Sequence, residues 1–313
     1  MKKVLVMLST YNGEKYLSEQ LNSLLAQNGI ELTILIRDDG SKDDTLGILR
    51  EYSANNSNII LDEGQNIGCA LSFYALMNKA VDDFSNYDYY AFCDQDDVWK
   101  EEKLSVAISK LDQETTNPYK LYFSCADYVN ADLSLIKKSH IPVEKLDFNT
   151  SLIRNYAIGC TMVLNIGLLK EALKINDYID SDDFNIKYLP LHDAWMNAVA
   201  FAINASAYAD NNSYILYRQH ENNATGSKNV FERYIKALKR RLNKKNWYYH
   251  KNALIYKFYL DRIVPKNMNI LFLIKEYDAS IYNTIRLCQR IDLKSEKTLD
   301  SVLWYIVILL RIF

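Results

Sequence analysis

The sequence lacks the cysteine spacing of a zinc site or a disulfide framework. Its five cysteines stand singly, and no two of them are spaced as C-x-x-C. Paired spacings of that kind mark structural zinc sites, and clustered cysteines mark small secreted domains. We therefore expect a reduced, cytoplasmic protein without structural zinc or disulfides.

Two glycine-rich phosphate-binding motifs are also missing. The turn after the first predicted strand, residues 9–13, has no G-x-G-x-x-G, and the sequence contains no G-x-x-x-x-G-K-[ST]. In the first motif glycines let the backbone approach a dinucleotide, and in the second they cradle the phosphates of ATP or GTP. Their absence argues against a dinucleotide-binding enzyme and against a P-loop ATPase or kinase.

Long apolar runs are absent from both ends of the sequence. Residues 4–8 are apolar, but polar residues interrupt them too early for a signal peptide, so we interpret them as a first strand. The nine apolar residues 302–310 are too few to span the roughly 30 Å hydrocarbon core as a helix. We expect this tail to lie in a core, in an oligomer interface or in one leaflet of a membrane.

The net charge of −2 hides a division of the chain into two parts. Residues 1–228 carry 20 Lys and Arg against 32 Asp and Glu, and residues 229–313 carry 17 against 7. A length of 313 residues allows two such domains. Residues 230–245 place apolar side chains on one helical face and basic ones on the others, which is typical of a helix at an anionic membrane surface. A helix that packs on the catalytic part with a solvated basic face fits the pattern equally well.

Apolar runs alternate with helical patterns in the first hundred residues. The runs at 4–8, 32–36, 59–61 and 89–93 are typical of strands buried on both faces, and apolar residues recur at helical spacing between them. This alternation predicts an α/β fold with a mostly parallel sheet flanked by helices. The polar turns at 9–13, 37–41, 64–68 and 94–97 then gather beyond the carboxyl ends of the strands, where ligands bind in such sheets.

Clustered carboxylates end the strand predicted at 89–93. Asp94, Asp96 and Asp97 offer oxygen ligands of the kind that Mg²⁺ and Mn²⁺ prefer. The alternative is a solvated acidic turn, with Asp97 as the N-cap of the next helix. A second acidic pair, Asp38 and Asp39, ends a neighbouring strand. Two acidic turns side by side favour a metal–nucleotide site.

These turns resemble those of a known family. The motifs are S-T-Y-N-G at 9–13, D-D-G-S-x-D-x-T at 38–45, N-x-G at 66–68 and D-Q-D-D-x-W at 94–99. In this order they resemble family 2 glycosyltransferases with the GT-A fold. Together with H-D-A-W at 192–195 and R-Q-H-E-N-N at 218–223, they are similar to rhamnosyltransferase-like bacterial members in particular. The resemblance covers about residues 1–228.

The resemblance implies roles for the matching residues. The base, ribose, diphosphate and sugar of a nucleotide-sugar would be held by Thr10, Tyr11, Asn12, Asp38, Asp39, Asn66, Gly68, Asp94, Gln95 and Asp97. A divalent ion, Mg²⁺ or Mn²⁺, would be held by Asp94, Asp96 and His220. For His220 the alternative is a residue that only caps a loop.

On the acceptor side, the resemblance implies a general base and its surroundings. Asp193 would lie in the first turn of a helix, where the dipole favours the ionised form that a base requires; an ordinary helix N-cap is the alternative. The residues expected around the acceptor are Gly159, Cys160, Thr161, His192 and Trp195. Residues 155–164 also fit a strand with a closely packed glycine, and His192 also fits a packing role.

We therefore expect an inverting, metal-dependent glycosyltransferase of bacterial cell-surface polysaccharide synthesis. The sugar suggested by the resemblance is L-rhamnose from dTDP-rhamnose, and the acceptor a free or lipid-linked saccharide. A UDP-hexose donor and an inactive saccharide-binding scaffold are alternatives. A nucleotidyltransferase would need a glycine-rich turn with Arg and Lys after the first strand. We expect no nucleic-acid partner, a cytoplasmic location with peripheral contact at the inner membrane face, and any oligomer to form through the C-terminal helices.

Overall fold

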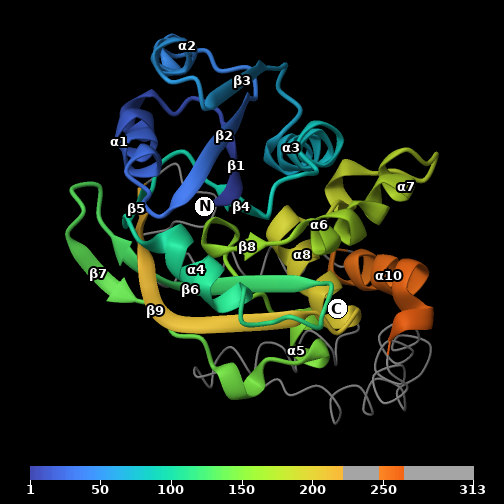
Figure 1. Cartoon of the computed structure of the whole chain (residues 1–313). Helices are drawn as coiled ribbons and strands as arrows, with labels where there is room; N and C mark the ends of the chain where they lie inside the picture. The colour runs from blue at the N-terminus through green and yellow to red at the C-terminus, as the bar shows by residue number, and fades with distance from the viewer. Residues whose placement is uncertain (221–246, 264–313) are drawn as a thin grey trace.

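The computed structural model describes residues 1–220 and 247–263, in which nine strands form one sheet (Figure 1). The strands are β1 (Lys2–Thr10), β2 (Ile30–Asp38), β3 (Ile59–Glu63), β4 (Tyr89–Cys93), β5 (Val98–Trp99), β6 (Lys120–Val129), β7 (Leu135–Lys138), β8 (Val163–Leu164) and β9 (Ser206–Arg218). The helices are α1 (Glu14–Leu25), α2 (Thr45–Asn55), α3 (Cys69–Asp83), α4 (Lys103–Leu111), α5 (Phe148–Ile153), α6 (Ile166–Ala172), α7 (Asn176–Ile179), α8 (His192–Ala202) and α10 (Trp247–Tyr259). Short 3₁₀ turns lie at Val143–Lys145, Gly159–Thr161, Leu173–Ile175, Ile186–Tyr188 and Leu260–Arg262.

The first four strands form the predicted parallel half of the sheet. Their order is β3-β2-β1-β4, and every neighbouring pair is parallel. In this register Thr10 lies opposite Asp38, and Leu8 lies opposite Cys93. The turns that follow β1, β2 and β4 therefore meet at one edge, as the sequence pattern predicts.

The second half of the sheet is mixed. It continues as β8-β6-β9-β5, with antiparallel pairing on both sides of β8 and parallel pairing between β6 and β9. β9 begins at Ser206 and has irregular register against β6. β9 also pairs with β5 beside the acidic turn. This pairing places Arg218, the last residue of β9, next to the acidic turn.

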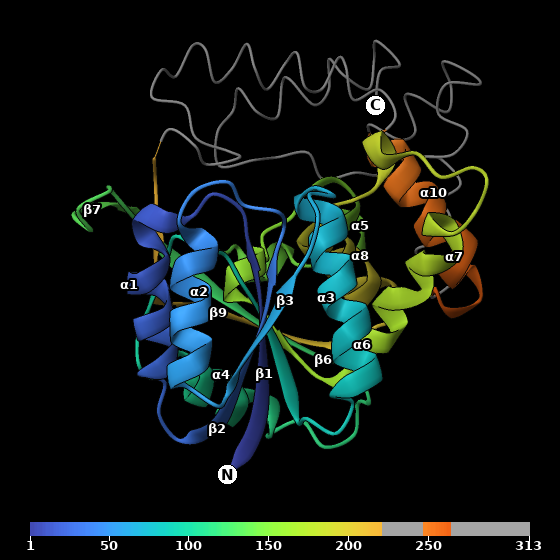
Figure 2. The same cartoon turned by 90° about the horizontal axis from the view of Figure 1, so that it is seen from above.

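Helices cover both faces of the parallel half. α1 and α2 lie on one side, and α3 and α6 lie on the other (Figure 2). Along β1 the side chains alternate between the two cores: Val4 and Val6 pack with the α1 side, and Leu5 and Met7 pack with the α3 side. Burial on both faces is why these strands are continuous apolar runs in the sequence.

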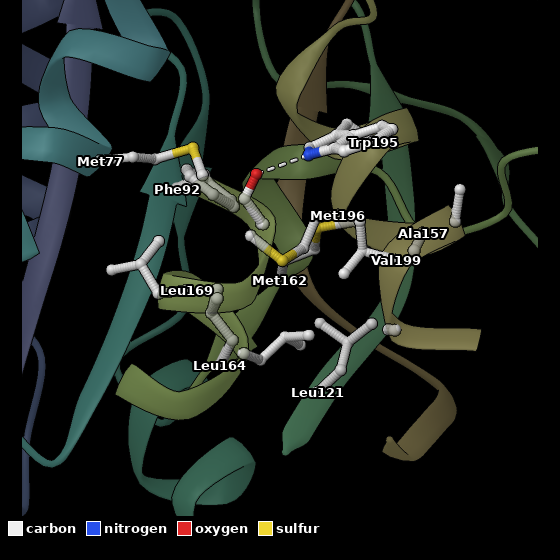
Figure 3. Close-up of a cluster of buried hydrophobic side chains, with 14 of the residues drawn as sticks. Met77, Phe92, Leu121, Ala157, Met162, Leu164, Leu169, Trp195, Met196 and Val199 are labelled. Atoms are coloured by element: carbon white, nitrogen blue, oxygen red, sulfur yellow. Dashed lines mark hydrogen bonds between the residues drawn. The ribbon is translucent and has the colours of Figure 1, made fainter. Parts of the chain in front are cut away.

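Trp195 belongs to the core on the α3 side (Figure 3). Its side chain has no exposed surface, and its indole Nε1 donates to the Ala172 carbonyl at 2.7 Å. A side chain enclosed in this way cannot touch a saccharide in solution. The expectation that Trp195 lines the acceptor side is therefore corrected: it anchors α8 to α6.

α10 packs into this same core. Leu254 and Ile255 belong to it, and the Tyr259 ring lies 6.1 Å from the Trp195 ring. Within residues 1–220 and 247–263, no helix is long and apolar enough to cross a membrane. The predicted basic helix at 230–245 and the apolar tail at 302–310 lie outside the described residues, so their roles stay predictions.

Trp195→Phe should lower the free energy of unfolding by about 1–3 kcal/mol more than a matched control, because it leaves the Ala172 carbonyl without its buried donor. The control is Trp99→Phe, since the buried Trp99 indole N–H has no hydrogen-bond partner among the described residues. Urea unfolding of both variants measures the difference. Equal costs would show that the Trp195 hydrogen bond adds nothing.

Candidate functional site

The turn after β2 is held by the carboxylate of Asp38. Its Oδ1 accepts from the hydroxyls of Thr10 and Ser41 at 3.0 and 2.5 Å. Its Oδ2 accepts from the backbone N–H groups of Gly40 and Ser41 at 3.1 and 2.8 Å. A carboxylate has about four lone-pair positions, so this buried one is saturated by the protein. The expected side-chain contacts of Thr10 and Asp38 with a donor are not supported: both residues shape the turn.

Asp39 joins this turn to the one before α3. Its carboxylate accepts from Arg37 Nη1 at 2.6 Å and from the backbone N–H groups of Ile67 and Gly68, each at 2.9 Å. The exposed side chain of Asn66 lies on the turn held in this way. The structure therefore brings Asp39, Asn66 and Gly68 together. Asp39 itself is buried beneath this turn.

The acidic turn is clamped to the turn after β1 by Gln95. Its Oε1 accepts from Tyr11 N at 2.7 Å, and its Nε2 donates to Tyr11 O at 3.0 Å. Gly13 leaves room for this amide, since a Cβ there would lie 2.4 Å from Gln95 Oε1. Gln95 thus fixes the peptide of Tyr11, whose side chain is 41% exposed.

Asn12 closes the same turn with a left-handed backbone. Its φ is 48°, a conformation that asparagine tolerates better than most residues. Its N–H donates to Ser41 Oγ at 2.9 Å, and its Oδ1 accepts from Lys42 N at 2.8 Å. Asn12 therefore ties the turn after β1 to the turn after β2.

A cavity of about 870 Å³ opens beside these turns. Five predicted site residues line it: Tyr11, Asn12, Gln95, Asp96 and His220. Two further lining residues, Gly13 and Gln219, belong to the motifs at 9–13 and 218–223 but had no predicted role. The remaining lining residues, which the sequence did not indicate, are Lys15, Tyr16, Asn130, Ala131 and Asp132. The cavity has the size of a small-molecule site and mixes aromatic with polar groups.

Asp96 and His220 meet at the wall of this cavity. His220 Nε2 lies 2.7 Å from Asp96 Oδ2, although the two residues are 124 positions apart. Arg218 makes this meeting possible, because its Nε donates to the Asp96 carbonyl at 2.8 Å and its backbone N–H donates to Asp97 Oδ1 at 3.0 Å. The rest of its buried guanidinium donates to Ala131 O and to Glu19. Nothing local in the sequence marks Arg218 as this link.

Beneath the cavity wall lies a second group of ligand atoms. Asp94, Asp97 and Cys160 each place one within 4.8 Å of the others. Burial, then the charges of Asp96 and Asp193, raises the pKa of Asp94 to about 7. Burial likewise raises the pKa of Asp97 and of the Cys160 thiol well above their usual values.

The structure brings only two of the three expected metal ligands together. Asp96 is adjacent to His220, whereas Asp94 places its ligand atom with those of Asp97 and Cys160, and no group of Asp94, Asp96 and His220 of that kind occurs in the described part of the chain. The carboxylate oxygens of Asp94 and Asp96 suit Mn²⁺ and Mg²⁺, whereas a protonated thiol does not. Asp97 has no exposed surface, so its expected contact with the donor sugar is not supported.

Asp193 lies in the first turn of α8, as predicted. Its Oδ1 accepts from Ala194 N at 2.6 Å, and its Oδ2 accepts from Asn155 Nδ2 at 2.9 Å. Burial raises the pKa of Asp193 to about 6, and these hydrogen bonds, with another from the Gly159 backbone, oppose the rise. Asp193 is therefore ionised at pH 7 and more basic than an ordinary aspartate. The sequence analysis did not identify Asn155.

His192 and Thr161 belong to the interior. The His192 ring stacks on Phe73 with centroids 3.8 Å apart, and burial lowers its pKa to about 3. Thr161 has no exposed surface and donates to the Ile158 carbonyl. Gly159 leaves room for His192, since a Cβ there would lie 2.6 Å from His192 Nε2. His192 is a packing residue, and the expected acceptor contacts of His192, Cys160 and Thr161 are not supported by their burial.

Comparison with solved structures bears on the fold. The structure resembles Staphylococcus aureus TarS 1–349 in complex with UDP-GlcNAc, with a TM-score of 0.55 at 18% identity over 99% of this chain and 90% of that one. It also resembles the mannosyltransferase PcManGT from Pyrobaculum calidifontis in complex with GDP-Man and Mn²⁺, with a TM-score of 0.54 at 14% identity over 99% and 85% of the two chains. These likenesses confirm the predicted GT-A fold.

Similarity in sequence extends to two named enzymes. The dTDP-rhamnosyl transferase RfbG of Shigella flexneri is 33% identical over 244 residues, which are 77% of this chain and 80% of RfbG. A UDP-Glc:alpha-D-GlcNAc-diphosphoundecaprenol beta-1,3-glucosyltransferase of Escherichia coli, WfgD, is 28% identical over 53% of this chain and 61% of that protein. The family described as Glycosyl transferase family 2 matches residues 5–173. The chain therefore belongs to glycosyl transferase family 2 and is a glycosyltransferase.

Proposed function

We propose that the protein transfers a sugar from a nucleotide-sugar to a saccharide acceptor, with metal dependence and inversion at the anomeric carbon. The observation that carries this proposal is the Asp96–His220 pair, with 2.7 Å between Oδ2 and Nε2, on the wall of a cavity that also includes the Tyr11 ring. In this proposal Asp96 and His220 bind an ion that contacts the diphosphate of the donor, and the Tyr11 side chain beside them stacks on its base.

The donor is proposed to lie across the turns after β1, β2 and β4. Tyr11 is exposed and lines the cavity, so its aromatic side chain offers a stacking surface for the base. Asp39 joins the turns after β2 and before α3 and is proposed to help hold the base and ribose. Similarity to RfbG supports dTDP-rhamnose as the donor. Similarity to WfgD keeps a UDP-hexose as the second candidate.

Asp94, Asp96 and His220 are the residues proposed to hold a divalent ion. Such an ion supplies Lewis-acid stabilisation of the negative charge that develops on the departing nucleoside diphosphate. Arg218 keeps Asp96 and His220 adjacent from beneath, through the carbonyl of Asp96. His220 thus lies at the lining of the cavity.

Asp193 is proposed to act as the general base. As the acceptor hydroxyl oxygen attacks the anomeric carbon, its proton passes to the Asp193 carboxylate, and the sugar–phosphate bond breaks on the opposite face. One carboxylate suffices, because no covalent intermediate forms. Asn155 and the Ala194 N–H hold this carboxylate in place, and its pKa of about 6 keeps it ionised yet basic near neutral pH.

The acceptor is proposed to be a free or lipid-linked saccharide of cell-surface polysaccharide synthesis. An anionic lipid-linked acceptor would attract the net positive residues 229–313, since each surface Lys or Arg contributes about 1 kcal/mol near anionic lipid. Peripheral contact with the inner membrane face stays a prediction on this charge pattern.

Gln95→Glu should weaken the binding of dTDP and UDP about 10-fold, because a carboxylate oxygen would replace the N–H that faces Tyr11 O at 3.0 Å. Calorimetric titration measures the two dissociation constants. Gln113→Glu makes the same charge change at an exposed position after α4 and should bind both nucleotides like the wild type. Unchanged binding by Gln95→Glu would contradict the role of the clamp.

Removal of the metal with EDTA should abolish hydrolysis of dTDP-rhamnose or UDP-hexoses, and Asp96→Asn should lose most turnover while it folds normally. Asp132→Asn is the control, since that carboxylate lines the same cavity but accepts from Ser134. Stabilisation of the protein by Mn²⁺ in thermal melts gives a second readout. Full activity in EDTA would refute the metal assignment. Nucleotide binding with no turnover of any donor would favour the inactive scaffold.

Asp193→Asn should lower turnover about 100-fold or more, the range for loss of a general base, while donor binding stays unchanged. In the wild type, turnover should fall as the pH falls through about 6, because protonation removes the base form of Asp193. Steady-state rates at saturating donor from pH 5 to 8 measure this fall of turnover with pH. Turnover that stays constant through pH 6, or survives in Asp193→Asn, would place the base elsewhere.

A further inference from the structure

A buried lysine reaches the catalytic part from α10. Lys251 is 2% exposed, and its Nζ donates to the Ser151 carbonyl of α5 at 2.8 Å. It lies outside residues 5–173, which match the family, and outside the part that the motifs cover. Because an ammonium group is costly to bury, its place in the core calls for a compensating interaction.

The hydrogen bond of Lys251 to Ser151 connects the lysine to the surroundings of Asp193. Ser151 lies in α5, and four residues further along the chain Asn155 donates to Asp193 Oδ2 at 2.9 Å. α5, α8 and α10 share one core, to which Leu152, Val199 and Ile255 belong. Asp193 is also near enough to Lys251 to act on its charge. The lysine is thus linked to the carboxylate both through α5 and through space.

We propose that Lys251 is a positioning residue for the general base: its ammonium group anchors the end of α5 that presents Asn155, and its charge favours the ionised form of Asp193. The inference rests on the proposed function only in naming Asp193 the base. On this proposal α10 helps to position the general base on the acceptor side of the site.

The charged groups around Asp193 decide whether Lys251 raises or lowers the pKa of that carboxyl group. Asp94 after β4 is negative when ionised, and the Cys69 thiol and the Tyr74 phenol of α3 are neutral, since the pKa of each lies well above 7. Burial lowers the pKa of Lys251 to about 7, and Asp193 opposes that change. The attraction between the two opposite charges acts on both groups, so the charged form of Lys251 favours the ionised form of Asp193.

The test follows the Asp193 carboxyl by ¹³C NMR of protein labelled at the aspartate carboxyl carbon, with the signal assigned from its loss in Asp193→Asn. Lys251→Met should raise the titration midpoint of Asp193 by about half a pH unit or more. Lys257→Met is the matched control, since Lys257 is exposed on the same helix, and it should leave the midpoint unchanged. An unchanged midpoint in folded Lys251→Met would overturn the proposal.

A second variant keeps the test decisive if Lys251→Met does not fold. Lys251→Gln retains an N–H donor but no charge, and it should raise the midpoint in the same direction. In sugar transfer, either variant should lower kcat at pH 6 and leave the KM for the donor unchanged, and a raised KM with unchanged kcat would overturn the positioning role. The NMR midpoint needs no substrate. A shifted midpoint in a protein without transferase activity would therefore support the Lys251–Asp193 link and refute the proposed function.

Discussion

The buried guanidinium of Arg218 holds the two halves of the site together. It comes from the end of β9 and donates to the Asp96 carbonyl in the acidic turn, to Glu19 of α1 and to Ala131 after β6. Only arginine offers several donors in one rigid planar fork, so a lysine could not make these contacts together. Because Arg218 is fixed, His220 two residues later has little freedom, and its ring is placed against Asp96.

The acidic groups of the site differ in how the protein holds them. Asp38 and Asp39 accept several hydrogen bonds each, which shape the turns after β2 and before α3. Burial and the charges of Asp96 and Asp193 raise the pKa of Asp94, and burial raises the pKa of Asp193 against the hydrogen bonds that it accepts. Perturbed groups of this kind concentrate where a protein does chemistry. The number of accepted hydrogen bonds does not separate these groups, since Asp193 accepts from Ala194 and Asn155. None of these differences is visible in the sequence.

The sequence predicted what depends on local pattern. The parallel strands, the common edge of their turns and the position of Asp193 at the start of α8 follow from apolar periodicity and from turn residues. It could not predict contacts between residues about a hundred positions apart, such as Gln95 with Tyr11, Arg218 with Asp96, and Lys251 with Ser151. Trp195, Asp38 and Asp97 were misplaced for the same reason, since a motif names a residue type but not the burial of its side chain.

The close approach of Gly13 to Gln95 couples the side chains that these two positions can hold. A methyl group at position 13 would occupy the space of the Gln95 amide oxygen, which is the mobile end of a side chain and can move aside at small cost to folding. The hydrogen bonds between the Gln95 amide and the Tyr11 backbone would be weakened instead. Homologues with a larger residue at position 13 should therefore carry a shorter one at position 95. Directed evolution toward other nucleotides could therefore vary positions 13 and 95 together. Such changes would alter the position of Tyr11 and leave the carboxylates of the site in place.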